Sequence, residues 1–343
     1  MRILDYKNKG ITFIIAEIGQ AHDGSLGLLH SLIEGAAKTG VDAVKFQVHI
    51  ADAESSLLEP FRIKFSYQDQ NRYEYWKRME LSEKDWIKIK KRCDDLGVEF
   101  LATPFSLAAV DLLETIGVKR YKIGSGDASN KLLLKKIVKT KKEIIISTGL
   151  GTLAELRTST SFLNNEGLPY TILQCTTKYP TNSDEIGLEW LKILEKNFNC
   201  PVGLSDHSGT IFSSLGAVTL GAAVIEAHIT FDKRMFGPDS RASLNLDEFS
   251  TMVEGIRFLE IARGRGLDKE QIGNKEELRR IFGRAIACNK KLSPGHVITF
   301  EDLETKKPAD AGISVNNYEE VIGKKLKNKK NAWEFLVHED FLD

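Results

Sequence analysis

Two histidines, His207 and His228, stand at or near the ends of two short apolar runs, 201–207 and 224–230. If these runs are neighbouring strands, they lie about 4.8 Å apart, so both imidazoles could contact one ion. Two imidazoles with open coordination positions suit a divalent cation such as Mn²⁺, Mg²⁺, Co²⁺ or Zn²⁺, with substrate and water as further ligands. The alternative is two separate histidines, each satisfied by hydrogen bonds.

Two lysines, Lys45 and Lys122, lie inside otherwise apolar runs, where an unpaired charge is costly. Lys122 belongs to the stretch KIGSGD, whose glycines permit close backbone approach and whose Ser125 supplies a hydroxyl. The stretch STG at 147–149 offers the same features with Ser147. Each motif alone is more often a turn or a helix cap. Together with two lysines, they predict a site for a small anion.

Carboxylates also stand at or near the ends of apolar runs. Glu17, in AEIG, stands where an apolar run ends and is a candidate general base. Asp127, Asp206 and Asp239 are close to other run ends, and the alternative for each is a helix cap or a loop ion pair. Cys175 has no histidine among its sequence neighbours to activate it, so we interpret it as a small buried residue.

The elements that must position these side chains form a regular alternation. Each of eight short apolar runs is followed by a candidate helix, as at 26–39, 83–96, 108–116 and 153–165. Such an alternation is typical of a parallel sheet covered by helices, and eight units in about 250 residues favour a closed (β/α)₈ TIM barrel, with catalysis at the carboxyl ends of the strands. The runs are 13–19, 43–48, 99–105, 120–125, 143–149, 170–176, 201–207 and 224–230.

Composition sets outer limits on function. The 343 residues include 48 lysines and arginines and 48 aspartates and glutamates, so the formal net charge is zero. This balance argues against a protein that coats nucleic acid or an anionic membrane. Four scattered cysteines without a CxxC pair argue against a zinc ribbon or a disulfide framework. No apolar signal core or run of 18 apolar residues is present, and we expect a cytoplasmic protein.

Three further segments are predicted. The connection 50–81 is long and rich in aromatic and charged residues, which favours either a lid or binding element, or an excursion that packs on the barrel side or on an oligomer partner. The barrel domain is predicted to span 1–264 and a linker 265–278. A small second domain follows at 279–343, with short strands and a Ser-Pro-Gly turn.

The motifs, taken in order, resemble the sialic acid synthase family. They are IAEIGQAHDGS, VKFQ, ATPF, YKIGSGD, STG, CTTKYP, GLSDHS and EAHITFDKRMFGPDSRASL, and the later GRAI, LSPGHVITFEDL and AGI resemble the small antifreeze-like (SAF) domain that follows the barrel in that family. The resemblance covers nearly the whole chain. It implies a metal-dependent condensation of phosphoenolpyruvate (PEP) with an open-chain N-acetylated amino sugar, such as N-acetylmannosamine. The products would be a nonulosonic acid and phosphate, with cleavage of the C–O bond of PEP.

The resemblance also implies a role for each matching residue. The catalytic carboxylates would be Glu17 and Asp127, and the metal ligands His207 and His228, with Mn²⁺ or Mg²⁺ as the cofactor and Co²⁺ as a further candidate. PEP would be bound by Lys45, Thr103, Lys122, Ser125, Ser147 and Ser205. The sugar would be bound by Gln47, Tyr179, Asp239 and Arg284, the last reaching from the SAF domain of the other subunit of a domain-swapped homodimer.

Four positions in the barrel domain depart from the family pattern, as does the GRAI stretch of the SAF domain, and they put the identity of the sugar in question. Ala21 and Thr177 replace asparagines, Ala227 replaces a lysine, and Ser240 replaces a histidine. A modified or diamino sugar precursor, as in legionaminate or pseudaminate synthesis, is therefore an alternative acceptor. Two other functions stay open: a PEP-aldose synthase of the octulosonate or heptulosonate phosphate type, and a barrel that binds sugar without catalysis.

Overall fold

Two compact units make up the chain, Met1–Arg265 and Gly266–Asp343. The computed structural model describes residues 1–264, 266 and 273–342. Each unit has its own buried apolar cluster. Among the described residues, no helix is both long and apolar enough to span a membrane.

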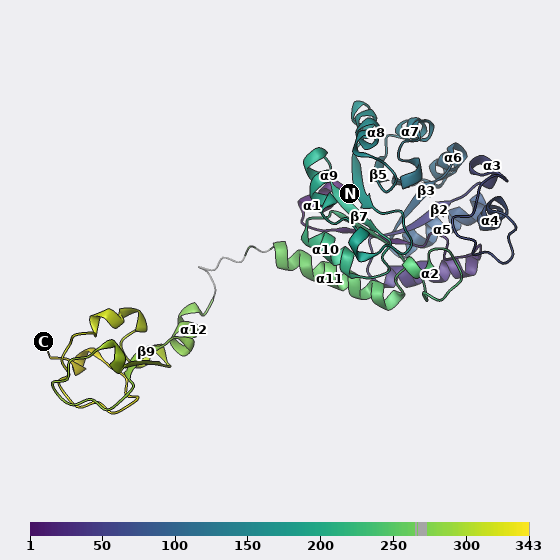
Figure 1. The fold of residues 1–343 in the computed structure, drawn as a ribbon. Coiled ribbons are helices and arrows are strands. Elements are labelled where there is room, and N and C mark those ends of the chain that lie inside the picture. The colour runs from purple at the N-terminus through teal and green to yellow at the C-terminus, as the bar shows by residue number, and fades with distance from the viewer. Residues whose placement is uncertain (265, 267–272, 343) are drawn as a thin grey trace. The chain divides into compact units, whose positions relative to one another are not determined.

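Eight parallel strands of the first unit form a closed barrel, in which β1 pairs with both β2 and β8. Figure 1 shows the strands surrounded by helices. All eight strands fall within the eight predicted apolar runs, so the (β/α)₈ TIM barrel is confirmed. The strands are β1 (Phe13–Glu17), β2 (Ala43–Val48), β3 (Glu99–Pro104), β4 (Arg120–Ile123), β5 (Glu143–Ser147), β6 (Tyr170–Cys175), β7 (Val202–Asp206) and β8 (Val224–His228).

Helices alternate with these strands along the chain of the first unit. They are α1 (Ile3–Asn8), α2 (Leu26–Lys38), α3 (Ala51–Glu54), α4 (Arg72–Met79), α5 (Glu83–Asp95), α6 (Leu107–Ile116), α7 (Lys131–Val138), α8 (Leu153–Asn165), α9 (Trp190–Asn197), α10 (Phe212–Thr219) and α11 (Leu246–Gly264). The four predicted helices are confirmed as α2, α5, α6 and α8. Their starts are fixed by Ser25, Ser82, Ser106 and Thr152, each of which accepts a hydrogen bond from the backbone N–H three residues later.

Side chains inside the barrel change character along its axis. A middle layer is apolar and includes Phe13, Ile15 and Leu101, with Ile3 of α1 packed against it. At the amino ends of the strands, Arg120 Nε donates to Glu99 Oε1 at 2.6 Å, and Arg120 also forms an ion pair with Glu143. Because strand side chains alternate between the two faces, the last inward positions of the strands meet at the carboxyl ends. Most of these last positions are polar.

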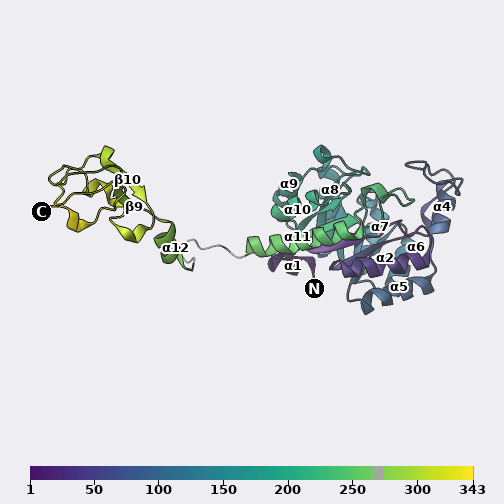
Figure 2. The same ribbon diagram turned by 90° about the horizontal axis from the view of Figure 1, so that it is seen from below.

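The connection between β2 and α5 contains α3 and α4, which lie at the outer edge of the barrel unit (Figures 1 and 2). It has a small buried cluster of its own, formed by Ala51, Tyr75, Trp76 and Met79. This local core gives the connection a defined shape.

The second unit contains α12 (Lys275–Phe282) and two antiparallel strands, β9 (Ala285–Cys288) and β10 (Leu303–Lys306). Four short 3₁₀ helices are also described, η4 (Phe300–Asp302), η5 (Ala309–Ala311), η6 (Val315–Glu320) and η7 (His338–Asp340). Its core includes Ile286, Ile298 and Leu336.

The ion-pair layer at the amino ends of the strands generates a stability prediction. Replacing Arg120 by leucine should lower the free energy of unfolding by about 3–5 kcal/mol, because Glu143 would remain buried without its cation. Urea unfolding followed by circular dichroism measures this. The exposed neighbour Lys119 is the control, and its replacement by alanine should change stability by no more than about 0.5 kcal/mol. Equal effects of the two substitutions would contradict the assignment.

Candidate active site

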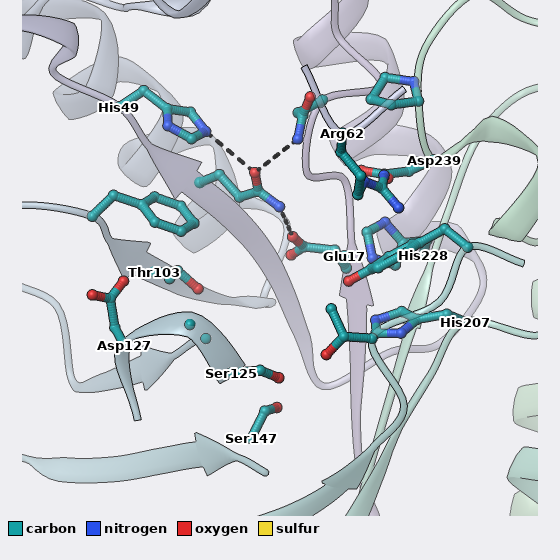
Figure 3. A pocket seen from close by; sticks show the side chains of 18 of the residues that line it. Glu17, His49, Arg62, Thr103, Ser125, Asp127, Ser147, His207, His228 and Asp239 are labelled. Carbon is teal, nitrogen blue, oxygen red and sulfur yellow. Dashed lines mark hydrogen bonds and ion pairs between the residues drawn. The ribbon is translucent and has the colours of Figure 1, made fainter. Parts of the chain in front are cut away.

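A pocket of about 480 Å³ opens at the carboxyl ends of the barrel strands. Figure 3 shows side chains from several strands and loops pointing into it. The predicted site residues of the barrel unit all line this one pocket: Glu17, Lys45, Gln47, Thr103, Lys122, Ser125, Asp127, Ser147, Tyr179, Ser205, His207, His228 and Asp239. The strands therefore bring together residues that are more than 200 positions apart in the sequence.

Four buried charges form a continuous chain on the floor of this pocket. Lys45 Nζ lies 3.0 Å from Glu17 Oε2 and 3.4 Å from Glu226 Oε1. Lys122 Nζ lies 3.5 Å from the same Glu226 oxygen. Strand register sets this order, because Glu17 is directly opposite Lys45 in the β1–β2 pair. All four side chains are at most 6% exposed, so neighbouring opposite charges replace the lost hydration.

The sequence analysis missed Glu226, and this changes the expected character of the site. We expected a site for a small anion from Lys45 and Lys122, but Glu226 lies between them and, with Glu17, balances their charge. The signal was present in the sequence, since Glu226 is a charged residue inside an apolar run just as the two lysines are. Ser205 Oγ donates to Glu226 Oε1 at 3.0 Å and fixes its orientation.

The two lysines differ in how burial and charge combine. Burial would lower the pKa of Lys45, but Glu17 and Glu226 outweigh it and the pKa is raised. At Lys122 burial prevails over Glu226 and the pKa is lowered. Burial would raise the pKa of Glu226, but Lys122 and Lys45 hold it below its usual value. Lys122 is therefore the cation that a further anion would stabilise most.

Hydroxyl groups gather around Lys122. Its Nζ donates to Ser147 Oγ at 2.6 Å, and Ser125 Oγ accepts from the backbone N–H of Gly149 at 3.2 Å. Ser125 begins the 3₁₀ helix η1 (Ser125–Asp127), and Thr103 Oγ1 lies 3.5 Å from Lys45 Nζ. Hydroxyls beside two ammonium groups provide donors for a small oxyanion.

The two histidines lie together beside the charged floor. Their ring centroids are 5.4 Å apart, and Tyr179 stacks on His207 at 4.0 Å. His207 Nδ1 lies 2.8 Å from the carbonyl oxygen of Thr176, which places the ring proton on Nδ1 and leaves Nε2 as a free electron-pair donor. Burial and His228 lower the pKa of His207 to about 3, so this imidazole is neutral at physiological pH.

This donor set suits a divalent cation that keeps several open positions. Among the described residues, no cluster of three or more histidines, cysteines, aspartates or glutamates has metal-binding geometry. The two imidazoles would be the cation's nitrogen ligands from the protein. Substrate oxygens and water would complete the coordination.

The outer rim of the pocket is built by the connection 50–81, which sequence analysis described as either a lid or a packing excursion. Arg62 NH2 donates to Asp239 Oδ1 at 2.8 Å, and the Arg62 guanidinium lies 4.2 Å from the Tyr179 ring centroid. Arg62 thus joins the connection to the loop after β8. Sequence analysis missed Arg62, because nothing in periodicity indicates where a loop side chain will point. The connection forms part of the pocket.

The structure also shows the surroundings of three further residues that the sequence analysis named. Asp127 accepts from Asn130 Nδ2 at 2.8 Å, and burial raises its pKa. Asp206 accepts hydrogen bonds from the backbone N–H of Ser208 and from the Ser213 hydroxyl, so it orders the loop after β7; α10 has Ile211 at its N-cap, and the expected helix-cap role of Asp206 is not found. Burial raises the pKa of Cys175, so the thiol stays protonated, as expected of a buried structural cysteine.

The four departures from the family pattern are distributed unequally. Thr177 lines the pocket, whereas Ala21, Ala227 and Ser240 are not among its lining residues. Ala227 belongs to the outer apolar core that packs against the helices. Arg284 lies in the second unit, where its NH1 donates to the carbonyl oxygen of Thr305 at 2.9 Å. Its predicted role at the sugar stays a prediction.

Comparisons with known proteins agree with this geometry. Residues 32–268 match the NeuB family and residues 283–341 match the SAF domain. The chain is 38% identical over 337 residues to the N,N'-diacetyllegionaminic acid synthase of Campylobacter jejuni, an alignment that covers 96% of this chain and 99% of the relative. It is 29% identical over 318 residues to the N-acetylneuraminate-9-phosphate synthase of Homo sapiens, covering 92% of this chain and 88% of the relative.

A solved structure shows the same fold. The crystal structure of the N-acetylneuraminic acid synthetase from Leptospira borgpetersenii, in complex with citrate, superposes with a TM-score of 0.69 and 30% sequence identity. The match covers 78% of this chain and 90% of that structure.

The charge balance on the pocket floor generates the second prediction. Replacing Glu226 by glutamine removes the negative charge shared by the two lysines, so inorganic phosphate should bind about 10-fold more tightly at pH 7. Isothermal titration calorimetry with inorganic phosphate measures this. Glu195→Gln, at an exposed ion pair with Lys7, should leave phosphate binding unchanged. Weaker phosphate binding by the Glu226 variant would contradict the proposed balance.

Proposed function

The chain belongs to the NeuB family, and we propose that it condenses PEP with an N-acetylated amino sugar to give a nonulosonic acid and phosphate. It is an enzyme of the synthase kind, as its relatives are. The observation that carries the proposal is the pair of buried lysines surrounded by hydroxyls, beside two histidines in one pocket. Such a floor offers one small polyanion the cations and donors that its desolvation requires.

Two groups of lysines and hydroxyls would bind the two charged ends of PEP. We assign its phosphate to Lys122, Ser125, Ser147 and Ser205, and its carboxylate to Lys45 and Thr103. The two lysines, which are paired with Glu17 and Glu226 in this structure, would form ion pairs with the bound PEP. Glu17 would then be free of its ion pair with Lys45 and available as the general base.

The acceptor is proposed to be an uncharged sugar at the outer rim, contacted by Gln47, Tyr179 and Asp239. The two arginines that line the rim are already paired with acids: Arg62 with Asp239, and Arg72 with Glu59 at 3.0 Å. Glu54 and Asp127 add further carboxylates. A phosphorylated aldose would meet this acidic rim without a free cation among the pocket's described residues, so the charges favour N-acetylmannosamine or a diacetamido relative.

His207 and His228 are proposed to hold a divalent cation, Mn²⁺ or Mg²⁺, with Co²⁺ as a further candidate. The neutral His207 ring with its free Nε2 fits this role. Bound there, the cation would supply the Lewis acidity that polarises the sugar aldehyde.

The reaction balances as follows. C3 of PEP forms a bond to the aldehyde carbon of the open-chain sugar, and the aldehyde oxygen becomes a hydroxyl with a proton that we assign to Asp127. Water adds to C2 of PEP and gives one proton to Glu17. The C2–O bond to phosphate then breaks, and the phosphate leaves with the bridging oxygen and the second proton of the water. A 2-keto acid remains, and holding both substrates in one pocket supplies the proximity that this joining needs.

The proposed activity predicts phosphate release from PEP that requires both a divalent cation and an N-acetylated hexosamine. With ¹⁸O in the bridging position of PEP, the label should appear in the released phosphate, because the C–O bond is cleaved. Mass spectrometry of the phosphate measures this. Label retained in the sugar acid would contradict the mechanism. Turnover only with phosphorylated arabinose or erythrose would move the enzyme to the octulosonate or heptulosonate class, and sugar binding without turnover would favour a binding protein.

The metal assignment has a test of its own. His207→Ala should abolish Mn²⁺ binding, measured by electron paramagnetic resonance of the free ion, while the circular dichroism spectrum stays unchanged. His30→Ala, on α2 and outside the pocket lining, is the control and should bind Mn²⁺ like the unmodified protein. Full Mn²⁺ binding by the His207 variant would contradict the site.

A further inference from the structure

A buried glutamate–histidine pair lies at one side of the pocket and contacts the residues proposed to face the substrates. His49 directly follows β2 and is 4% exposed as a residue. Its ring stacks on Trp76 of α4 and on Phe105 after β3, with centroid distances of 3.9 and 4.7 Å. The ring planes are nearly parallel, at 18° and 6°. This stacking fixes the imidazole plane, so the two ring nitrogens can form hydrogen bonds only with groups that lie in that plane.

Both imidazole nitrogens have partners. Nδ1 lies 2.7 Å from Glu54 Oε1, and Nε2 lies 3.2 Å from Gln47 Oε1. Gln47 Nε2 in turn donates to Glu17 Oε1 at 2.9 Å, and Figure 3 shows the two links that join His49 to Glu17 through the glutamine amide. The chain therefore runs from the connection 50–81 to the carboxylate that also pairs with Lys45.

The hydrogen-bond chemistry gives this chain one direction. The carboxylate of Glu17 accepts, so the amide nitrogen of Gln47 must face it and the amide oxygen must face His49. His49 Nε2 therefore carries a proton. Gln20 Nε2 donates to the same amide oxygen at 3.4 Å, which supports this orientation. Glu17 therefore sets the orientation of the Gln47 amide, and the donors of His49 and Gln20 hold the amide oxygen in place.

Glu54 has a second feature that points to a ligand. Its side chain is 7% exposed, and among the described residues its Oε2 accepts no hydrogen bond although that atom is buried. Glu54 lines the pocket, and a buried acceptor without a donor is costly. A hydroxyl of a bound sugar would supply the missing donor.

We propose that His49 and Glu54 are positioning residues for the acceptor sugar: they lock the Gln47 amide toward Glu17, and Glu54 Oε2 accepts from a sugar hydroxyl. This inference rests on the proposed function. The connection 50–81 thereby joins sugar recognition to the catalytic carboxylate. PEP contacts, on the far side of Glu17, do not depend on the pair.

Kinetics of His49→Phe test the proposal, because phenylalanine keeps a ring between Trp76 and Phe105 but removes both hydrogen bonds. With the best acceptor of an N-acetylhexosamine panel, kcat/KM for the sugar should fall about 10- to 100-fold, while KM for PEP stays within about twofold and the melting temperature is retained. His49→Gln should restore part of the loss, since its amide can donate to Gln47. A rise in KM for PEP equal to the rise in KM for the sugar, or unchanged sugar kinetics, would overturn the proposal.

Glu54 offers a matched series. In Glu54→Gln the amide nitrogen can donate to His49 Nδ1 and the oxygen can accept from the sugar, so kcat/KM should stay within about threefold. Glu54→Leu should match the loss in His49→Phe. Asp52→Asn is the control, since Asp52 lies in the same short helix and pairs with the exposed Lys77. A Gln variant as impaired as the Leu variant would overturn positioning in favour of a role for the charge.

Failure of this inference differs from failure of the proposed function. An active unmodified enzyme with unaffected His49→Phe sugar kinetics overturns the positioning pair and leaves the synthase assignment intact. An unmodified enzyme that releases no phosphate from PEP with any sugar overturns the proposed function and the role of the pair with it.

Discussion

The function of the barrel depends on two lysines and two carboxylates that are buried together on the floor of one pocket. Each of Lys45, Lys122, Glu17 and Glu226 is nearly inaccessible to water, and each is within 3.5 Å of an opposite charge. Such groups stabilise a fold only weakly, because desolvation offsets much of the attraction between them. Their arrangement is better explained by a ligand whose charges replace one partner in each of these ion pairs. A polyanion that attracts the lysines would release Glu17 for proton transfer.

Strand register provides this arrangement and explains how much of it could be predicted. Apolar runs alternating with helices predicted the barrel, and the polar residue at the end of each run predicted where chemistry would lie. The residues Lys45, Lys122 and His228 were found in this way, because a charged or polar residue inside an apolar run is informative. Glu226 carried the same signal and was missed. What a sequence does not show is the partner of such a charge, since that depends on which strands become neighbours.

The rim of the pocket was less accessible to sequence reasoning. Arg62, His49 and Glu54 come from, or directly precede, the connection 50–81, where no periodicity relates sequence position to direction. Their places are set by the local aromatic core around Trp76 and by the ion pair with Asp239. The relatives are named for different acids, which agrees with the proposed division between a floor that binds PEP and a rim that binds the sugar. Of the four departures from the family pattern in the barrel domain, Thr177 lines the pocket, whereas Ala21, Ala227 and Ser240 do not.

The central claim is that one polyanion and one divalent cation meet on this floor. A crystal structure with PEP and Mn²⁺, with the anomalous signal of manganese recorded, tests it most directly. The account predicts the PEP phosphate against Lys122, Ser125 and Ser147, and a manganese peak within about 2.3 Å of one nitrogen each of His207 and His228. PEP bound away from the lysines, or a manganese peak that neither histidine contacts, would contradict the account.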